Sequence, residues 1–183
     1  MKLKNNYTHL FFDLDHTLWD TDANAKKSLV QMYDLFQLKQ LGIDNRELFI
    51  EKYLAINHRL WDDYSKGKIN KSFLRTGRFE LTLQQFGIVN PQLIEPLADY
   101  FVSKTPYHQT LIPHAIALLT HLQPKYKLYI ITNGFKEAQH TKLRSSAIDH
   151  FFEDVFISEE VGFHKPDPQI FFHAIEKSNA AME

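Results

Sequence analysis

The sequence predicts an α/β fold: a Rossmann-like, doubly wound parallel sheet with an inserted all-helical segment. Three short apolar stretches, at residues 10–14, 127–134 (leading into a turn) and 154–158, are typical of buried strands, and helical patterns follow them. The stretch between the first two strands is helical and shows no convincing strand. We therefore expect residues 1–20 and 106–183 to form the core domain and residues 21–105 to form a helical insert.

The core elements alternate in the order that a parallel sheet requires. The first run is interrupted by one aspartate, and near-continuous apolar runs are typical of strands buried on both faces of a sheet. Residues 113–122, 135–147 and 168–177 have helical periodicity. Helices of this length between parallel strands cover both faces of the sheet.

The insert reads as a series of four capped amphipathic helices. Polar residues that favour helix starts precede each one, and glycine follows the first three. The expected starts are Thr21 or Asp22, Asp44 or Asn45, Asn70, and Asn90-Pro91, and the glycines are Gly42, Gly67 and Gly87. The first helix is expected to run to Leu41 without a break.

Aromatic residues of the insert are expected to pack between its helices. Alternatively, one or two of them line a binding face and stack on a nucleobase. Trp19, directly after the stretch D-L-D-H-T-L at 13–18, is the better candidate for an aromatic residue near a cleft. The insert residues considered are Tyr53, Trp61, Tyr64, Phe73 and Phe79.

The amino-acid composition is typical of a soluble globular protein and argues against nucleic-acid-binding and membrane proteins. The 183 residues include 44% hydrophobic and 23% charged residues, as in soluble globular proteins, and the formal net charge is −1. No global field attracts nucleic acid or lipid, so we expect neither a nucleic-acid polymer nor a membrane as partner. The chain has no cysteine and no apolar stretch of membrane-spanning length. We expect a soluble cytoplasmic protein, of undetermined oligomeric state, that binds any phosphate at a local site.

Polar residues gather where the three strands end. Asp13 and Asp15 close the first strand, Thr132-Asn133-Gly134 follows the second, and the loop 163–167, which contains Lys165, follows the third. Ligands of open parallel sheets bind beyond the carboxyl ends of the strands. Two carboxylates, a hydroxyl and an ammonium in one cleft suit phosphoryl transfer.

Each of these residues has a chemical role available to it. Asp13 can be the nucleophile that forms an aspartyl phosphate, and Asp15 can be the general acid and then the general base. Thr132 and Lys165 can hold the phosphoryl oxygens, while Gly134 gives the backbone room to bend. Two carboxylates repel a phosphate, so Asp13 and Asp15 require a hard cation, and oxygen ligands point to Mg²⁺.

Three motifs resemble the first three signatures of the haloacid dehalogenase superfamily, in the same order: D-L-D-H-T-L (13–18), I-T-N-G (131–134) and K-P-D-P (165–168). The resemblance implies a helical cap at the insert, a nucleophile at Asp13 and an acid/base at Asp15, whose carbonyl binds the metal. It also implies phosphate binding by residues 132–134, with Lys165 as the stabilising cation. The second aspartate marks phosphatases and phosphomutases, so Asp15 argues against dehalogenation.

The residues around the motifs look most like the capped phosphatases that act as pyrimidine 5′-nucleotidases. They are L-D-H-T-L-W-D and S-E-E-V-G-F-H-K-P-D-P-Q-I-F. The resemblance implies a Mg²⁺-dependent phosphatase of small phosphate monoesters, with nucleoside 5′-monophosphates as candidate substrates. Two alternatives stay open: a sugar-phosphate phosphomutase on the same site, and a non-catalytic protein that binds phosphate ligands.

The superfamily has a fourth motif, an apolar strand that ends in G-D and supplies further metal ligands. It is expected soon after the helix that follows Lys165, and the sequence ends at Glu183 without it. A sheet with its first strand at an open edge is also unfavourable. We therefore expect the natural protein to continue beyond Glu183, with the remaining metal ligands there.

Overall fold

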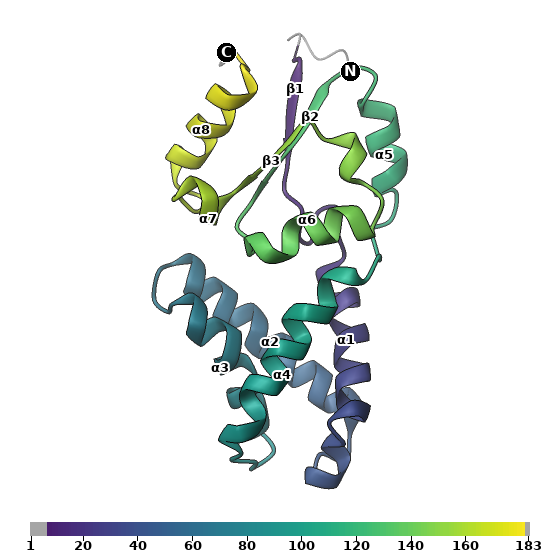
Figure 1. Cartoon of the computed structure of the whole chain (residues 1–183), viewed down its shortest axis with the longest axis vertical. Coiled ribbons are helices and arrows are strands. Elements are labelled where there is room, and N and C mark those ends of the chain that lie inside the picture. The colour runs from purple at the N-terminus through teal and green to yellow at the C-terminus, as the bar shows by residue number, and fades with distance from the viewer. Residues whose placement is uncertain (1–6, 182–183) are drawn as a thin grey trace. The chain divides into compact units, whose positions relative to one another are not determined.

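The computed structural model describes residues 7–181. The chain divides into two compact units (Figure 1). One consists of the residues up to Thr21 together with those from Pro106 onward, and the other is Asp22–Thr105. The first unit contains the sheet and the second is helical.

The sheet has three parallel strands in the order β1-β2-β3. They are β1 (His9–Phe12), β2 (Lys127–Thr132) and β3 (Asp154–Ile157). In β2, Ile130 is paired with Phe12, and Thr132 is paired with Ile157. All three strands therefore end at the same edge of the sheet, and the predicted parallel α/β core is confirmed.

Helices cover both faces of this sheet, as Figure 1 shows for α5 and α6 on one side and α8 on the other. Alternate residues of β2 point to opposite faces. Leu128 and Ile130 belong to the core cluster that includes residues of α5 and α6, whereas Tyr129 and Ile131 pack with residues of α8. The helices are α5 (Ala115–Leu122), α6 (Lys136–Ser145) and α8 (Pro168–Ser178), with a 3₁₀ helix at Asp149–Phe151 and the unpredicted short helix α7 (Ser158–Val161).

The helical unit contains most of α1 (Thr21–Leu35), then α2 (Arg46–Ser65), α3 (Lys71–Gln84) and α4 (Pro91–Lys104). A 3₁₀ turn, Thr105–Tyr107, begins at its last residue. Two expected N-caps are present: Asn45 Oδ1 accepts from Leu48 N at 2.9 Å, and Asn70 Oδ1 accepts from Phe73 N at 2.8 Å. These bonds satisfy amide groups that the first turn of a helix leaves without a partner.

The first helix is shorter than the sequence predicts. It ends at Leu35, and Gln37 adopts a left-handed conformation with φ of 51°. A 3₁₀ helix, Leu38–Leu41, follows and ends at Gly42, whose φ is 100°. The prediction of one continuous helix to Leu41 was wrong because a left-handed residue cannot continue a right-handed helix.

Two of the five insert aromatic residues considered above lie in the core of the helical unit. Tyr53 and Phe79 are fully buried, with ring centroids 5.0 Å apart. Phe73 is 41% exposed, and Trp61 and Tyr64 are in edge contact. Tyr53 and Phe79 therefore pack between helices, as expected. Within the described part of the chain, no helix is both long and apolar enough to cross a membrane.

Candidate active site

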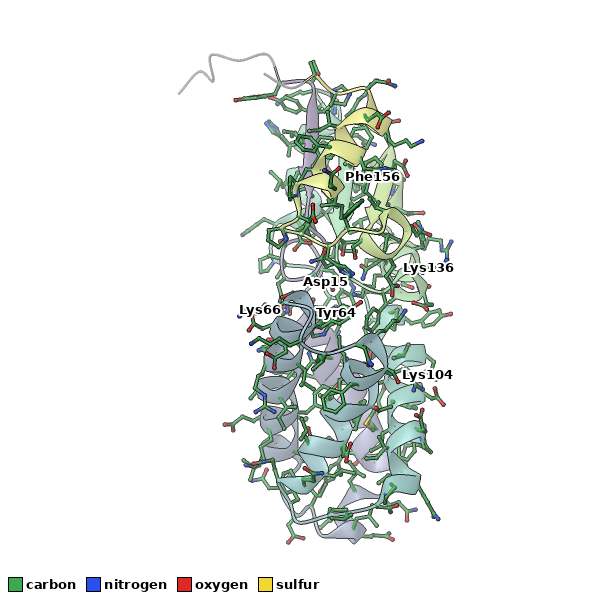
Figure 2. All side chains as sticks on the ribbon, turned by 90° about the vertical axis from the view of Figure 1, so that its left-hand side faces the viewer. Asp15, Tyr64, Lys66, Lys104, Lys136 and Phe156 are labelled. Carbon is green, nitrogen blue, oxygen red and sulfur yellow. The ribbon has the colours of Figure 1, made fainter. Side chains whose placement is uncertain are left out.

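A tight turn follows β1 and presents two carboxylates. Leu14 is fully buried, and its carbonyl oxygen accepts hydrogen bonds from the amides of Leu18 and Trp19 at 2.9 and 3.0 Å. Asp13 and Asp15 flank Leu14, and both are partly exposed. Asp15 lies beyond the strand ends, whereas Phe156 lies within the sheet (Figure 2). The buried leucine therefore anchors the turn, and the aspartates on either side of it remain accessible.

Lys165 is paired with the first carboxylate. Its Nζ lies 2.6 Å from Oδ1 of Asp13 and donates a second bond, of 2.7 Å, to the carbonyl oxygen of Ile131. Thr17 makes a longer contact of 3.4 Å with Oδ2 of Asp13. The Lys165 and Asp13 side chains are 22% and 39% exposed, so solvent still reaches the pair. An ammonium fixed beside a carboxylate can neutralise charge on a bound anion.

Asn133 fixes the backbone of Lys165. Its Oδ1 accepts from the Lys165 amide at 2.8 Å, and its Nδ2 donates to the Lys165 carbonyl oxygen at 2.9 Å. The side-chain amide thus bonds both polar groups of one peptide residue on the neighbouring loop. Asn133 positions Lys165, and its predicted part in phosphate binding stays a prediction.

Thr132 and Gly134 form a small turn at the end of β2. The buried hydroxyl of Thr132 accepts from the Gly134 amide at 3.0 Å, and its own O–H can still donate to an anion. The φ of Gly134 lies outside the left-handed region, so backbone freedom does not explain this glycine. A Cβ atom here would lie 1.6 Å from Nε2 of Gln139. A side chain at position 134 would therefore displace the Gln139 amide from its place beside Asp15.

Asp15 is held by side chains that sequence reasoning missed. Oδ1 accepts from Lys142 Nζ at 2.6 Å and from Thr21 Oγ1 at 2.9 Å, while Oδ2 accepts from Gln139 Nε2 at 3.3 Å. Lys142 and Gln139 lie three residues apart on α6 and therefore share one face of that helix. The three-residue spacing of Gln139 and Lys142, in a helix that begins near a strand end, is the sequence feature that could have indicated a role at the site.

These contacts set the ionisation of Asp15. Burial raises its pKa, but the charge and hydrogen bond of Lys142, with hydrogen bonds from Thr21 and Gln139, outweigh burial and hold the pKa below its ordinary value. Asp15 is therefore a carboxylate at neutral pH in this structure.

Trp19 lies against the same group. It is fully buried, and its Nε1 donates to the His108 carbonyl oxygen at 3.2 Å. Lys142 Nζ lies 4.6 Å from the centre of the indole ring, a cation–π distance. The structure thus places Trp19 behind the Lys142–Asp15 pair, where it is closed to direct contact with solvent.

Comparison with known proteins identifies the family. Residues 7–183 match the model of the haloacid dehalogenase-like hydrolases. The HAD-hydrolase YfnB of Bacillus subtilis is 33% identical over 172 residues, which cover 93% of this chain and 70% of YfnB. The chain therefore belongs to the haloacid dehalogenase-like hydrolase family and is an enzyme of that family.

Two further relatives have more specific names. Pyrimidine 5′-nucleotidase YjjG of Escherichia coli is 32% identical over 169 residues, 92% of this chain and 70% of its own length. Rat N-acylneuraminate-9-phosphatase is 28% identical over 170 residues, 91% of this chain and 67% of its own length. Both names describe phosphatases, consistent with the capped phosphatase and nucleotidase branch of the superfamily.

The fold matches that of a solved relative. The crystal structure of YfnB bound to magnesium superimposes with a TM-score of 0.82 at 29% identity, covering 94% of this chain and 74% of YfnB. In YfnB, that crystal form reveals interdomain movement. The likeness over nearly the whole chain supports the assignment to the family.

Proposed function

We propose that this protein is a Mg²⁺-dependent phosphatase that hydrolyses small phosphate monoesters through an aspartyl phosphate on Asp13. The observation that supports it most is the 2.6 Å contact between Lys165 Nζ and Asp13 Oδ1, with a second carboxylate, Asp15, two residues further on. A nucleophile, a fixed cation and a separate acid/base are the groups that this chemistry needs.

The first displacement forms the covalent intermediate. A carboxylate oxygen of Asp13 attacks phosphorus, the bond between phosphorus and the ester oxygen breaks, and Asp15 gives its proton to the departing oxygen. A bound phosphate dianion repels the Asp15 carboxylate and thereby raises its pKa, which favours the protonated form that this step requires. Lys165 and the Thr132 hydroxyl offset the charge on the phosphoryl oxygens.

The second displacement releases phosphate. Asp15, now ionised, takes a proton from water while the water oxygen attacks phosphorus. The bond between Asp13 and phosphorus breaks, which regenerates the carboxylate and leaves inorganic phosphate. The contacts of Asp15 lower its pKa and keep it ionised, which is the form that can accept a proton from water.

The donor set fits a magnesium ion. Oδ2 of Asp13 has one long contact, with Thr17 at 3.4 Å, and oxygen is the ligand type that Mg²⁺ prefers. The family resemblance implies the carbonyl oxygen of Asp15 as the second ligand, while the Asp15 carboxylate accepts a hydrogen bond from Lys142. A bound ion would reduce the repulsion between the carboxylates and the phosphate.

Nucleoside 5′-monophosphates are the first substrate class to test. The resemblance around the first and third motifs and the name of YjjG both support pyrimidine nucleotides. The name of N-acylneuraminate-9-phosphatase supports a sugar acid phosphate as the competing class. The residues of the core motifs are suited to bind only the phosphoryl group. We therefore propose that residues of the helical unit determine which of the two substrate classes is hydrolysed.

The test is phosphate release from pyrimidine and purine 5′-monophosphates, N-acylneuraminate 9-phosphate and hexose phosphates, with Mg²⁺ and with a chelator. Asp13→Asn is the matched control because it keeps the shape and removes the nucleophile. We expect Mg²⁺-dependent release that the control lacks, fastest with pyrimidine nucleotides. Phosphate transfer between sugar positions without net release would instead support the phosphomutase. Binding of beryllium fluoride without turnover of any ester would support the non-catalytic binding protein.

A further inference from the structure

Asp15 is held on both of its carboxylate oxygens by side chains from one helix, α6. Lys142 Nζ lies 2.6 Å from Oδ1, and Gln139 Nε2 lies 3.3 Å from Oδ2. Thr21 Oγ1 adds a third bond, of 2.9 Å, to Oδ1. A carboxylate with partners on both oxygens has one orientation about its side-chain torsions, because rotation would break two bonds together.

Lys142 is nearly buried, in a place where its ion pair with Asp15 adds little to the stability of the protein. Its side chain is 10% exposed, and its ammonium lies over the ring of the fully buried Trp19. Removing an ion pair from water costs about as much free energy as its attraction returns, so such a pair adds little net stability. Its effect is geometric: a fixed ammonium defines where Oδ1 of Asp15 must lie.

Gln139 fixes the other oxygen, and the local packing is arranged around it. The residue is fully buried, and its Nε2 occupies the space that a Cβ at Gly134 would take. Its Oε1 is buried without a hydrogen-bond partner among the described residues. An unpaired buried oxygen costs free energy, so the contact with Asp15 is kept at the expense of stability.

The two oxygens of Asp15 are not equivalent. Oδ1 accepts two short bonds, whereas Oδ2 accepts a single bond of 3.3 Å. Each carboxylate oxygen has two lone pairs, so Oδ2 retains one that can face a reacting group. Of the two oxygens, Oδ2 therefore has the larger unused capacity to accept a hydrogen bond.

We propose that Lys142 and Gln139 are positioning residues that orient Asp15 so that Oδ2 exchanges the proton in both displacements. This inference rests on the proposed phosphatase reaction and assigns roles to two residues outside the three sequence motifs. In the first displacement the Oδ2 proton moves to the ester oxygen as its bond to phosphorus breaks. In the second, Oδ2 accepts a proton from the attacking water.

The variants are Lys142→Met, Lys142→Arg and Gln139→Met, with Arg144→Met as control. Arg144 is an exposed cation on the same helix, two residues from Lys142. Methionine keeps the length of each positioning side chain and removes its donor. Arginine keeps the charge and the hydrogen-bond donors of Lys142, so Lys142→Arg tests whether these restore activity. If Lys142→Met does not fold, Gln139→Met still tests whether the α6 side chains orient Asp15.

Two substrates separate a positioning role from a structural one. A nucleoside monophosphate has a poor leaving group that needs a proton, whereas p-nitrophenyl phosphate has a good one that does not. With the nucleotide, Lys142→Met should lower kcat at least about tenfold with little change in KM. With the aryl ester, the first displacement stays fast and the second becomes slow, so we expect a burst of p-nitrophenol stoichiometric with the enzyme.

We also expect Lys142→Arg to recover part of the lost kcat and Gln139→Met to show the burst of p-nitrophenol. Arg144→Met should have the kinetics of the wild type. Equal losses on both esters without a burst, or full activity in both methionine variants, would overturn the proposal. If the wild-type chain releases phosphate from neither ester, the proposed function fails by itself. In that case, crystal structures of the wild type and Lys142→Met test the positioning role without activity. A rotated Asp15 carboxylate in the variant supports the role, and an unmoved one contradicts it.

Discussion

Lys165 donates to Oδ1 of Asp13 over 2.6 Å although 152 positions separate the two residues in the sequence. The contact joins the end of the first strand to the loop that precedes the last described helix. A second bond, to the Ile131 carbonyl oxygen, fixes the ammonium at the end of β2. The nucleophile proposed here therefore has a cation held in place before any substrate binds, which is the condition for electrostatic preorganisation.

Removing this cation should slow the reaction far more than it weakens binding. We predict that Lys165→Met lowers kcat about 10²–10³-fold, as for the loss of one preorganised donor to the transition state. The measurement is steady-state phosphate release, with Lys177→Met, an exposed lysine of α8, as the control. Wild-type kcat in Lys165→Met would contradict the role of this residue.

Asn133 should matter because it aligns the Lys165 backbone. We predict that Asn133→Ala lowers the free energy of unfolding by about 1–3 kcal/mol, because two backbone groups lose their partner, and lowers kcat as well. Asn133→Asp keeps the acceptor for the Lys165 amide but loses the donor, so it should fall between alanine and wild type. Urea unfolding and phosphate release check both effects, and full stability in the alanine variant would show that the two bonds contribute nothing.

Gly134 and Gln139 should be energetically coupled. Gly134→Ala places a methyl group 1.6 Å from the Nε2 position of Gln139, so that side chain must move away from Asp15. We predict that Gly134→Ala is destabilising in the wild-type background and less so when combined with Gln139→Ala, since the closest contact is then removed and only Oδ2 of Asp15, at 3.1 Å, remains near the methyl group. A double-mutant cycle by urea unfolding measures the coupling. Additive effects would mean that the glycine is required for another reason.

Asp15 should contribute to the acid dependence of stability. Its folded-state pKa lies below the ordinary value of 3.8 because Lys142, Thr21 and Gln139 together outweigh burial. A carboxyl group with a lowered folded pKa stabilises the protein above the unfolded pKa and loses that contribution as pH falls through the folded pKa. We predict that stability declines less on acidification in Asp15→Asn than in wild type. Urea midpoints measured from neutral pH down to about pH 3 test this, and parallel curves would contradict it.

The fold was predictable because the apolar runs of the strands are short, separate and followed by helical patterns. Asp13 and Asp15 could be selected as site residues for the same reason: they occupy the end of a strand that should otherwise be apolar. The end of α1 before Gln37 could not be predicted, because no glycine marks that left-handed position. The residues before and after Gln37 both favour helix, so the sequence gives no sign that the helix ends there.

The supporting residues were harder to predict than the motif residues. Lys142 and Gln139 look like surface positions of an amphipathic helix, and lysine is rarely buried. Only the packing of α6 against the sheet turns that face toward Asp15. The bonds between Asn133 and Lys165 likewise depend on the approach of two loops that are distant in sequence.

The most direct test of the central claim is to trap the covalent intermediate on Asp13. The enzyme is mixed with its best substrate and Mg²⁺, quenched in acid and reduced with borohydride, which converts an aspartyl phosphate to homoserine. Peptide mass spectrometry should find homoserine at position 13 and nowhere else, with none formed in the absence of substrate. Phosphate release without homoserine at Asp13, or release that persists in Asp13→Asn, would contradict the account.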